Sequence, residues 1–136
     1  MKSSIINMGD DKNERIKNKK CNKCNAIFEV IEDCNCSNCK LTCCGEEMMD
    51  LIPNSVEASY EKHIPTFEIE GNNIKITVNH VMEDEHFIKW IKVVTGTEEI
   101  TKFFKPGEEV NLILPLEKDM IIYAYCNKHG LWKTEV

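Results

Sequence analysis

The chain has 136 residues, of which 42% are hydrophobic, so it suits one domain of ordinary size or a compact domain with a small appendage. Its longest apolar run, MIIYAYC (120–126), is far too short to span a bilayer, and the first twenty residues lack the apolar stretch of a secretory signal. The formal charge is −6, and because residues 1–20 carry +3, the remaining body is strongly acidic. We therefore expect a cytoplasmic protein that binds neither membranes nor nucleic acid.

The first half of the chain is rich in thiols. Residues 1–20 carry scattered charges and little apolar surface, which predicts a flexible tail. Seven of the eight cysteines follow between Cys21 and Cys44, and in a cytoplasmic protein they indicate metal ligands rather than a disulfide framework. The segment 21–52 is too short to build its own apolar core and would need a metal to fold. A linker around LIPNS (51–55) separates it from a second domain, 53–136.

The second domain reads as a series of short strands separated by turns. The expected strands are TFEIE (66–70), IKITVNH (74–80), HFIKWIKVVTG (86–96), EEITKFFK (98–105), VNLILP (110–115) and MIIYAYC (120–126). Turn residues lie between them, including GNN (71–73), PGEE (106–109) and PLEKD (115–119). This spacing predicts an all-β domain, and an antiparallel β-sandwich in particular.

The chemically distinctive residues of this domain are its histidines and its lone cysteine. Strand alternation places His80 on the same face as Ile74, Ile76 and Val78, and it places Cys126 on the same face as Ile122 and Ala124. All four histidines of the chain fall at predicted strand edges or turns, at positions 63, 80, 86 and 129. A mixed set of imidazole and thiolate ligands fits iron, copper or zinc rather than magnesium or calcium.

At this point the residues resemble a known family. Residues 61–136 resemble superoxide reductase, and residues 21–136 resemble desulfoferrodoxin, its two-centre form. The motifs that carry the resemblance are EKHIP, HVMEDEH, FIKWI, KFFKPGE and YCNKHGLWK. The resemblance implies an immunoglobulin-like antiparallel β-sandwich, preceded by a small metal-stapled, desulforedoxin-like β segment. It also implies a mononuclear iron in the sandwich, with four equatorial ligands and one axial ligand: His63, His80, His86 and His129 in the plane, and Cys126 on the axis.

The chemistry that this family performs fits such a site. Five protein ligands leave one octahedral position open, and a thiolate opposite that position pushes electron density toward a bound oxygen ligand. The resemblance implies reduction of superoxide to hydrogen peroxide at ferrous iron, followed by re-reduction from an external donor, expected to be a rubredoxin-type protein. It also implies that Lys62 attracts the anion and assists protonation, that Glu61 caps the ferric iron, and that the protein is a homodimer.

The thiol-rich segment permits two ligand sets. CNKC and the pair Cys43-Cys44 resemble a desulforedoxin centre, which implies one iron held by Cys21, Cys24, Cys43 and Cys44, with zinc as an alternative metal. The rival set is Cys21, Cys24, Cys36 and Cys39, spaced like a zinc ribbon or rubredoxin knuckle. Cys34, Cys36 and Cys39 are not part of the family pattern, and they could be unligated, redox-active or an alternative metal site.

Two other functions compete with the enzyme reading. Cys-x2-His near the end of a β-sandwich also occurs in cupredoxin-like electron carriers, but the continuation GLWKTEV lacks the axial methionine that such sites usually have. A non-enzymatic zinc-binding module would explain the cysteines and leave the histidines unexplained. Metal content and absorption spectra separate the three readings.

Overall fold

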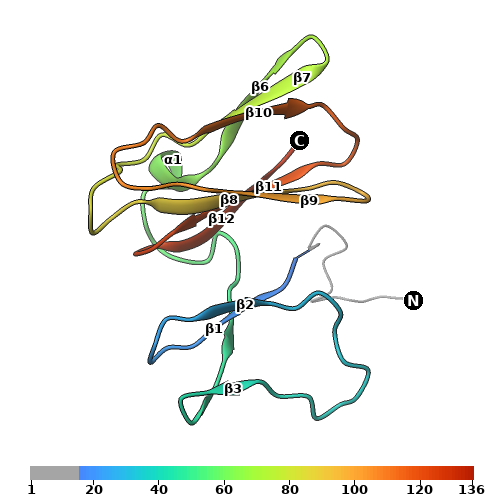
Figure 1. The fold of residues 1–136 in the computed structure, drawn as a ribbon, viewed down its shortest axis with the longest axis vertical. Coiled ribbons are helices and arrows are strands. Elements are labelled where there is room, and N and C mark those ends of the chain that lie inside the picture. The colour runs from blue at the N-terminus through green and yellow to red at the C-terminus, as the bar shows by residue number, and fades with distance from the viewer. Residues whose placement is uncertain (1–15) are drawn as a thin grey trace. The chain divides into compact units, whose positions relative to one another are not determined.

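The computed structural model describes residues 16–136, which divide into two compact units between Leu51 and Ile52 (Figure 1). Most of the tail predicted for residues 1–20 therefore lies outside the described residues. Within residues 16–136, no helix is long and apolar enough to cross a membrane.

The N-terminal unit is built from short antiparallel strands. Among its described residues these strands are β1 (Asn18–Lys20), β2 (Ile27–Glu29), β3 (Thr42–Cys43), β4 (Glu46–Glu47) and β5 (Met49–Asp50). One sheet has the order β2–β1–β5, and β3 pairs with β4 as a separate hairpin. The flexible tail was predicted to run to residue 20, and that boundary is wrong, because β1 is the central strand of the first sheet.

Nothing in the sequence NKK indicates a strand. β1 forms because the strands on either side pair with it. Lys19 pairs with Phe28 on one side and with Asp50 on the other, and the side chain of Asn18 is buried. Among residues 16–51, the buried apolar side chains are only Ile16, Cys21 and Met48. So small a core fits the expectation that this unit depends on bound metal.

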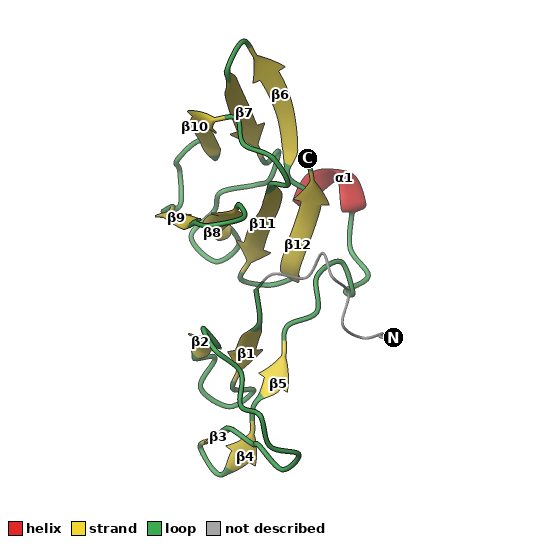
Figure 2. Ribbon diagram, turned by 90° about the vertical axis from the view of Figure 1, so that its right-hand side faces the viewer, coloured by secondary structure: helices red, strands yellow, loops and turns green. Residues whose placement is uncertain are grey.

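The C-terminal unit contains one short helix and the longer strands. Within residues 52–136 these elements are α1 (Tyr60–His63), β6 (Thr66–Glu70), β7 (Asn73–Thr77), β8 (Ile88–Val94), β9 (Glu99–Phe103), β10 (Asn111–Pro115), β11 (Ile121–Cys126) and β12 (Gly130–Glu135). One antiparallel sheet has the order β10–β7–β6 and the other the order β12–β11–β8–β9, and Figure 2 shows both. The predicted all-β, immunoglobulin-like antiparallel sandwich is confirmed.

The core lies between these two sheets. On β7 the alternation is clear, since Ile74 and Ile76 are buried while Asn73 and Lys75 are exposed. These side chains cluster with buried residues of β8 and β11, including Ile91. All six residues of β11 are buried, so this strand is covered on both faces. The buried end of β11 is Cys126, and the core thus determines where the thiol lies.

In the C-terminal unit the expected strands match β6 to β11, and two elements of this unit were not expected. The helix α1 is a single turn, too short to produce a helical period in the sequence. As a result His63, predicted to lie at a strand edge or turn, lies at the end of a helix. The other unexpected element is β12, where Leu131 and Trp132 are buried in succession, so the strand shows no alternation.

Candidate metal centres

The turn between β11 and β12 positions a thiol and an imidazole together. Cys126 pairs with Gly130 across the hairpin, and Gly130 has φ +82°, a conformation that glycine adopts without strain. The Cys126 side chain is completely buried, and the backbone N–H of His129 donates to its Sγ over 3.4 Å. His129 Nδ1 lies 3.9 Å from the same sulfur. The CNKH motif therefore turns both ligand-type atoms toward one point.

Helix α1 orients the buried ring of His63. Its Nδ1 lies 2.7 Å from the carbonyl oxygen of Ser59, so Nδ1–H donates there and Nε2 is left with its lone pair. The ring stacks on Trp132 with centroids 4.9 Å apart. The indole is itself fixed, because its Nε1–H donates to the carbonyl of His129 over 3.0 Å. Hydrogen bonding and stacking thus fix both the tautomer and the direction of the ring.

His80 and His86 come from the loop between β7 and β8. His80 Nδ1 donates to the carbonyl of Val81, which leaves its Nε2 as the free acceptor. His86 is fixed through the backbone, where it exchanges hydrogen bonds with Glu83 over 3.0 and 3.1 Å. Among the described side chains, three buried nitrogens have no hydrogen-bond partner: Nε2 of His80, Nε2 of His86 and, in the N-terminal unit, Nδ2 of Asn18. Buried polar atoms are normally satisfied, so two orphaned nitrogens at one place point to a missing ligand.

The side chain of Asn127 joins this loop to the hairpin turn. The N–H of Phe87 donates to Asn127 Oδ1 over 2.9 Å, and Asn127 Nδ2 donates to the carbonyl of Glu85 over 3.0 Å. The backbone N–H of Asn127 also donates to the carbonyl of Phe87. His86 lies between the two clamped residues, so Asn127 holds it at a fixed distance from Cys126.

The predicted ligands converge. One potential ligand atom from each of His63, His86, Cys126 and His129 lies within 4.8 Å of the others. His80 is not in that group, but its ring centroid lies 4.7 Å from that of His63 and 4.6 Å from that of His86. The fifth predicted residue is therefore in contact with the cluster, at its edge.

Burial sets the protonation of these groups. It lowers the pKa of His63 and His86, and it lowers that of His80 to about 4. The imidazoles are therefore neutral at pH 7, which is the form that binds a metal. Burial raises the pKa of the Cys126 thiol, against the opposing effect of the Lys128 and His129 backbone N–H groups. A cation would have to displace the thiol proton as it binds.

The arrangement fits a transition-metal ion. His63 Nε2 lies 3.0 Å from His129 Nδ1, and two ligands bound at right angles, each about 2.1 Å from an ion, lie about 3.0 Å apart. Nitrogen and sulfur donors of this kind suit iron, copper or zinc. Three further residues complete the surroundings: Ser59, Asn127 and Trp132. Asn127 and Trp132 lie within the YCNKHGLWK motif, but the contacts that these three residues make form only in the fold, so the sequence alone did not reveal their roles.

The two charged residues predicted to act beside the site lie on α1. Glu61 and Lys62 immediately precede His63, and both side chains are exposed. Lys128, in the hairpin turn, is also exposed, and its charge contributes to lowering the pKa of His86. Positive charge therefore reaches the cluster from the hairpin turn.

A second cluster lies in the N-terminal unit and consists of thiols. The sulfur atoms of Cys21, Cys24, Cys43 and Cys44 all lie within 4.8 Å of one another. The Sγ atoms of Cys24 and Cys43 are 3.7 Å apart. Backbone N–H groups of the CNKC turn lower the pKa of Cys21 to about 7, while the neighbouring thiols raise that of Cys43 to about 12.

The hairpin between β3 and β4 presents two of these sulfurs. Its turn residues, Cys44 and Gly45, both have positive φ, +54° and +80°, as a two-residue type I′ turn requires. Adjacent cysteines can thus direct both thiols to the same cluster. The rival set predicted from CxxC spacing is not brought together, since Cys36 and Cys39 lie in a separate group with Cys34.

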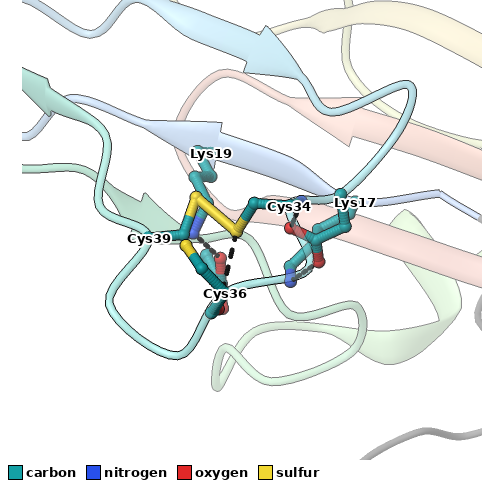
Figure 3. The surroundings of a disulfide bond; sticks show 7 residues. Lys17, Lys19, Cys34, Cys36 and Cys39 are labelled. Carbon is teal, nitrogen blue, oxygen red and sulfur yellow. Dashed lines mark hydrogen bonds and ion pairs between the residues drawn. A yellow bond between two sulfur atoms is a disulfide. The ribbon is translucent and has the colours of Figure 1, made fainter.

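Those three remaining cysteines lie in the loop between β2 and β3. Cys34 and Cys39 form a disulfide, and Cys36 is free and exposed (Figure 3). The expectation that the cysteines serve as metal ligands rather than in disulfides is therefore wrong for this pair. The two cysteines are five residues apart in the chain, and their Cα atoms lie 6.4 Å apart.

Comparison with known proteins gives a consistent answer. The family model described as desulfoferrodoxin matches residues 55–135. Desulfoferrodoxin from Desulfarculus baarsii is 35% identical over 126 residues, covering 90% of this chain and 98% of that protein. Desulfoferrodoxin from Nitratidesulfovibrio vulgaris is 36% identical over 120 residues, covering 85% and 93%.

A solved structure shares the fold. The crystal structure of the superoxide reductase from Treponema pallidum matches with a TM-score of 0.63 and 26% identity, over 79% of this chain and 92% of that one. The matches to the two desulfoferrodoxins extend over both units, and the family model covers the sandwich with its cluster of histidines and Cys126. The chain therefore belongs to the desulfoferrodoxin family.

Proposed function

We infer that the protein is a superoxide reductase, an oxidoreductase that converts superoxide, one electron and two protons into hydrogen peroxide. Its family, and its likeness to the Treponema pallidum enzyme, support this activity. The observation that carries the inference is the convergence of imidazole nitrogens and one buried thiol from three separate stretches of the sandwich: α1, the loop between β7 and β8, and the turn between β11 and β12. No purely structural role requires two orphaned imidazole nitrogens at that point.

We propose that four histidines and one cysteine would hold the iron: His63, His80, His86, His129 and Cys126. When bound there, iron supplies the electron that superoxide takes up and then regains one from an external donor. Burial lowers the pKa of His63, His80 and His86 and keeps these imidazoles neutral. The His129 N–H bonded to Cys126 Sγ stabilises negative charge on the sulfur.

We assign the handling of the substrate to α1. Lys62 precedes a proposed ligand and is exposed, so its ammonium can attract an anion to a protein whose formal charge is −6. It can also deliver protons through nearby water as the peroxide leaves. Glu61, exposed on the same helix turn, is the carboxylate that we propose covers the metal when substrate is absent.

The thiol cluster is proposed as a second iron centre. Four thiolates close the coordination shell, so this centre would transfer electrons or stabilise the N-terminal unit rather than bind substrate. Zinc is the alternative occupant, because the same sulfur donors suit it. A rubredoxin-type donor, a homodimer and a cytoplasmic location complete the proposal.

The competing functions predict different metals. A cupredoxin-like carrier would use two histidines and a weak axial methionine, whereas four histidine rings meet in this cluster. A zinc-binding module would have no need of the histidine cluster. We expect iron in both centres of the purified protein. Copper with an intense thiolate absorption band, or zinc alone, would exclude the proposed activity.

The decisive experiment is the substitution Cys126→Ser. We expect it to abolish superoxide reduction, because a neutral hydroxyl cannot replace the proposed thiolate ligand, while the thiol cluster keeps its metal. The measurements are the superoxide reduction rate and the iron content per chain, with the wild-type protein as the reference. Full activity in a folded Cys126→Ser protein would contradict the ligand assignment.

A further inference from the structure

The loop between β2 and β3 holds a group of thiols that the proposed function does not use. The potential ligand atoms of Cys34, Cys36 and Cys39 lie within 4.8 Å of one another. The structure joins Cys34 to Cys39 in a disulfide, with Cα atoms 6.4 Å apart, and leaves Cys36 as a free thiol beside it. Figure 3 shows the three sulfur-bearing side chains turned toward one another.

A structural role does not explain this disulfide. Residues 31–41 are all exposed, so the ring encloses no core that a covalent link would stabilise. The link spans only five positions, and the shortest loops gain least from cross-linking. Disulfides in reducing compartments are usually transient and catalytic or redox-sensing.

The surroundings hold the loop in place but leave its sulfurs open to solvent. Lys17 Nζ pairs with Asp33 Oδ2 over 2.7 Å, and the N–H of Cys34 donates to Asp33 Oδ1 over 2.9 Å. The first cysteine of the group is thereby tied to the body of the N-terminal unit. A small oxidant or an external thiol can still reach the sulfur atoms.

We propose that Cys34 and Cys39 form a redox-active dithiol–disulfide pair that hydrogen peroxide oxidises and an external dithiol reduces. In the oxidation, one thiolate attacks peroxide, an S–O bond forms, the O–O bond breaks, and hydroxide leaves to take up a proton. The second thiol then attacks the sulfenic sulfur, the S–S bond forms, and water leaves. Two thiols and one peroxide thus give one disulfide and two molecules of water.

An external dithiol reduces the disulfide back to two thiols by thiol–disulfide exchange. A thiolate of the external dithiol attacks one sulfur, a mixed disulfide forms, and the second thiol of the reductant displaces it as the protein thiols are released. The free Cys36, close to both sulfurs, allows the disulfide to move within the loop. The product of superoxide reduction is the natural oxidant, and the reducing compartment is the proposed cytoplasmic location. In these two points the proposal rests on the proposed function.

The test uses the full metal-loaded protein and adds hydrogen peroxide directly, so it does not depend on superoxide reduction. The protein is reduced with dithiothreitol, freed of it, treated with peroxide, alkylated under denaturing conditions and digested after lysine. We expect the peptide 24–40 to carry a disulfide between Cys34 and Cys39 and an alkylated Cys36. A second treatment with dithiothreitol should restore three alkylated thiols in residues 34–39, without loss of iron.

Matched variants separate this role from its alternatives. Cys34→Ser/Cys39→Ser should lose the peroxide-dependent disulfide, Cys36→Ser should retain it, and both should keep the superoxide reduction rate and iron content of the parent protein. Three alkylated thiols after peroxide treatment would overturn the proposal. So would a disulfide that resists dithiothreitol, or whose reduction unfolds the N-terminal unit, since it would then be structural. Tight zinc binding by the reduced loop that blocks oxidation would identify a metal site instead.

Discussion

At the scale of single residues, a substitution of Lys62 tests the electrostatic attraction of the substrate separately from metal binding. Its side chain is exposed on α1, next to His63 but not among the converging donors. We expect Lys62→Ala to lower kcat/KM for superoxide about tenfold, because a local positive field increases the encounter rate of an anion. The rate should also become less sensitive to ionic strength, since screening acts on the charge that was removed.

The matched control for this prediction is Lys118→Ala. Lys118 is also exposed, but it lies in the turn between β10 and β11, so its removal changes the net charge without altering α1. Stopped-flow or pulse-radiolysis rates across a salt series would compare the two variants. Equal rates in the two variants at every ionic strength would reduce Lys62 to an ordinary surface lysine.

A substitution of Asn127 tests whether hydrogen bonds that support the proposed ligands contribute to iron affinity. Its amide clamps Glu85 and Phe87, the residues on either side of His86. We expect Asn127→Ala to weaken iron binding at the histidine–cysteine cluster by about 10- to 100-fold, the usual effect of losing such support. Competition with a chelator of known affinity measures the change.

The control is Asn111→Ala, because within residues 16–136 the Asn111 side chain donates to the carboxylate of Glu109 alone, over 3.1 Å. This contact lies outside the cluster, so iron affinity should stay at the parent value. An Asn127→Ala protein that holds iron as tightly as Asn111→Ala would show that the backbone alone positions His86.

At the scale of elements, the β3–β4 hairpin depends on one glycine. Gly45 has φ +80°, and nothing lies within 4 Å of the position that a Cβ would take. The cost of Gly45→Ala therefore comes from the backbone alone, and we expect about 1 kcal/mol of lost stability in the N-terminal unit. Denaturation of the metal-loaded protein, followed through the absorption of the thiolate centre, provides the measurement.

Gly96→Ala is the appropriate comparison, since that position also has open space but no positive φ. It should change stability by less than about 0.5 kcal/mol, as surface substitutions usually do. If both variants lost equal stability, the turn conformation of Cys44-Gly45 would not explain the loss in Gly45→Ala.

The elements that the sequence predicted are those with an apolar pattern. On β7 the alternation of Ile74 and Ile76 with exposed neighbours was readable because one face of that sheet meets the core. In contrast, β1 is polar and becomes a strand only through pairing with β2 and β5. The strand β12 was missed because Leu131 and Trp132 are both buried, and α1 because one helical turn leaves no period.

The same division applies to the site. Residue type and motif spacing indicated the histidines, Cys126 and the thiols, since few side chains bind transition metals. Nothing in the order of residues indicated that Asn127 would clamp the loop around His86, or that Trp132 would stack on His63. Such contacts depend on distant strands meeting, and a single sequence does not record them.

At the scale of the whole molecule, the two units should respond differently to loss of metal. Within residues 16–51 the buried apolar side chains are few, whereas the sandwich has a continuous core that includes Ile76, Ile91 and Ile122. Metal binding can supply about 10–16 kcal/mol to a small thiolate-bound domain, which is more than the stability of most domains. We expect the metal-free protein to unfold across residues 16–51 and to stay folded across residues 52–136.

Hydrogen exchange read by mass spectrometry resolves this difference, because peptides from each unit report separately. After removal of both metals by a chelator, amides of β1 and β2 should exchange at the rate of an unfolded chain, while those of β8 and β11 stay protected.

Two variants act as internal controls. Cys43→Ser should reproduce the loss of protection in the N-terminal unit alone, and Cys126→Ser should leave both units protected. Retained protection of β1 without metal would mean that Ile16, Cys21 and Met48 suffice as a core, and the thiol cluster would then serve electron transfer rather than folding.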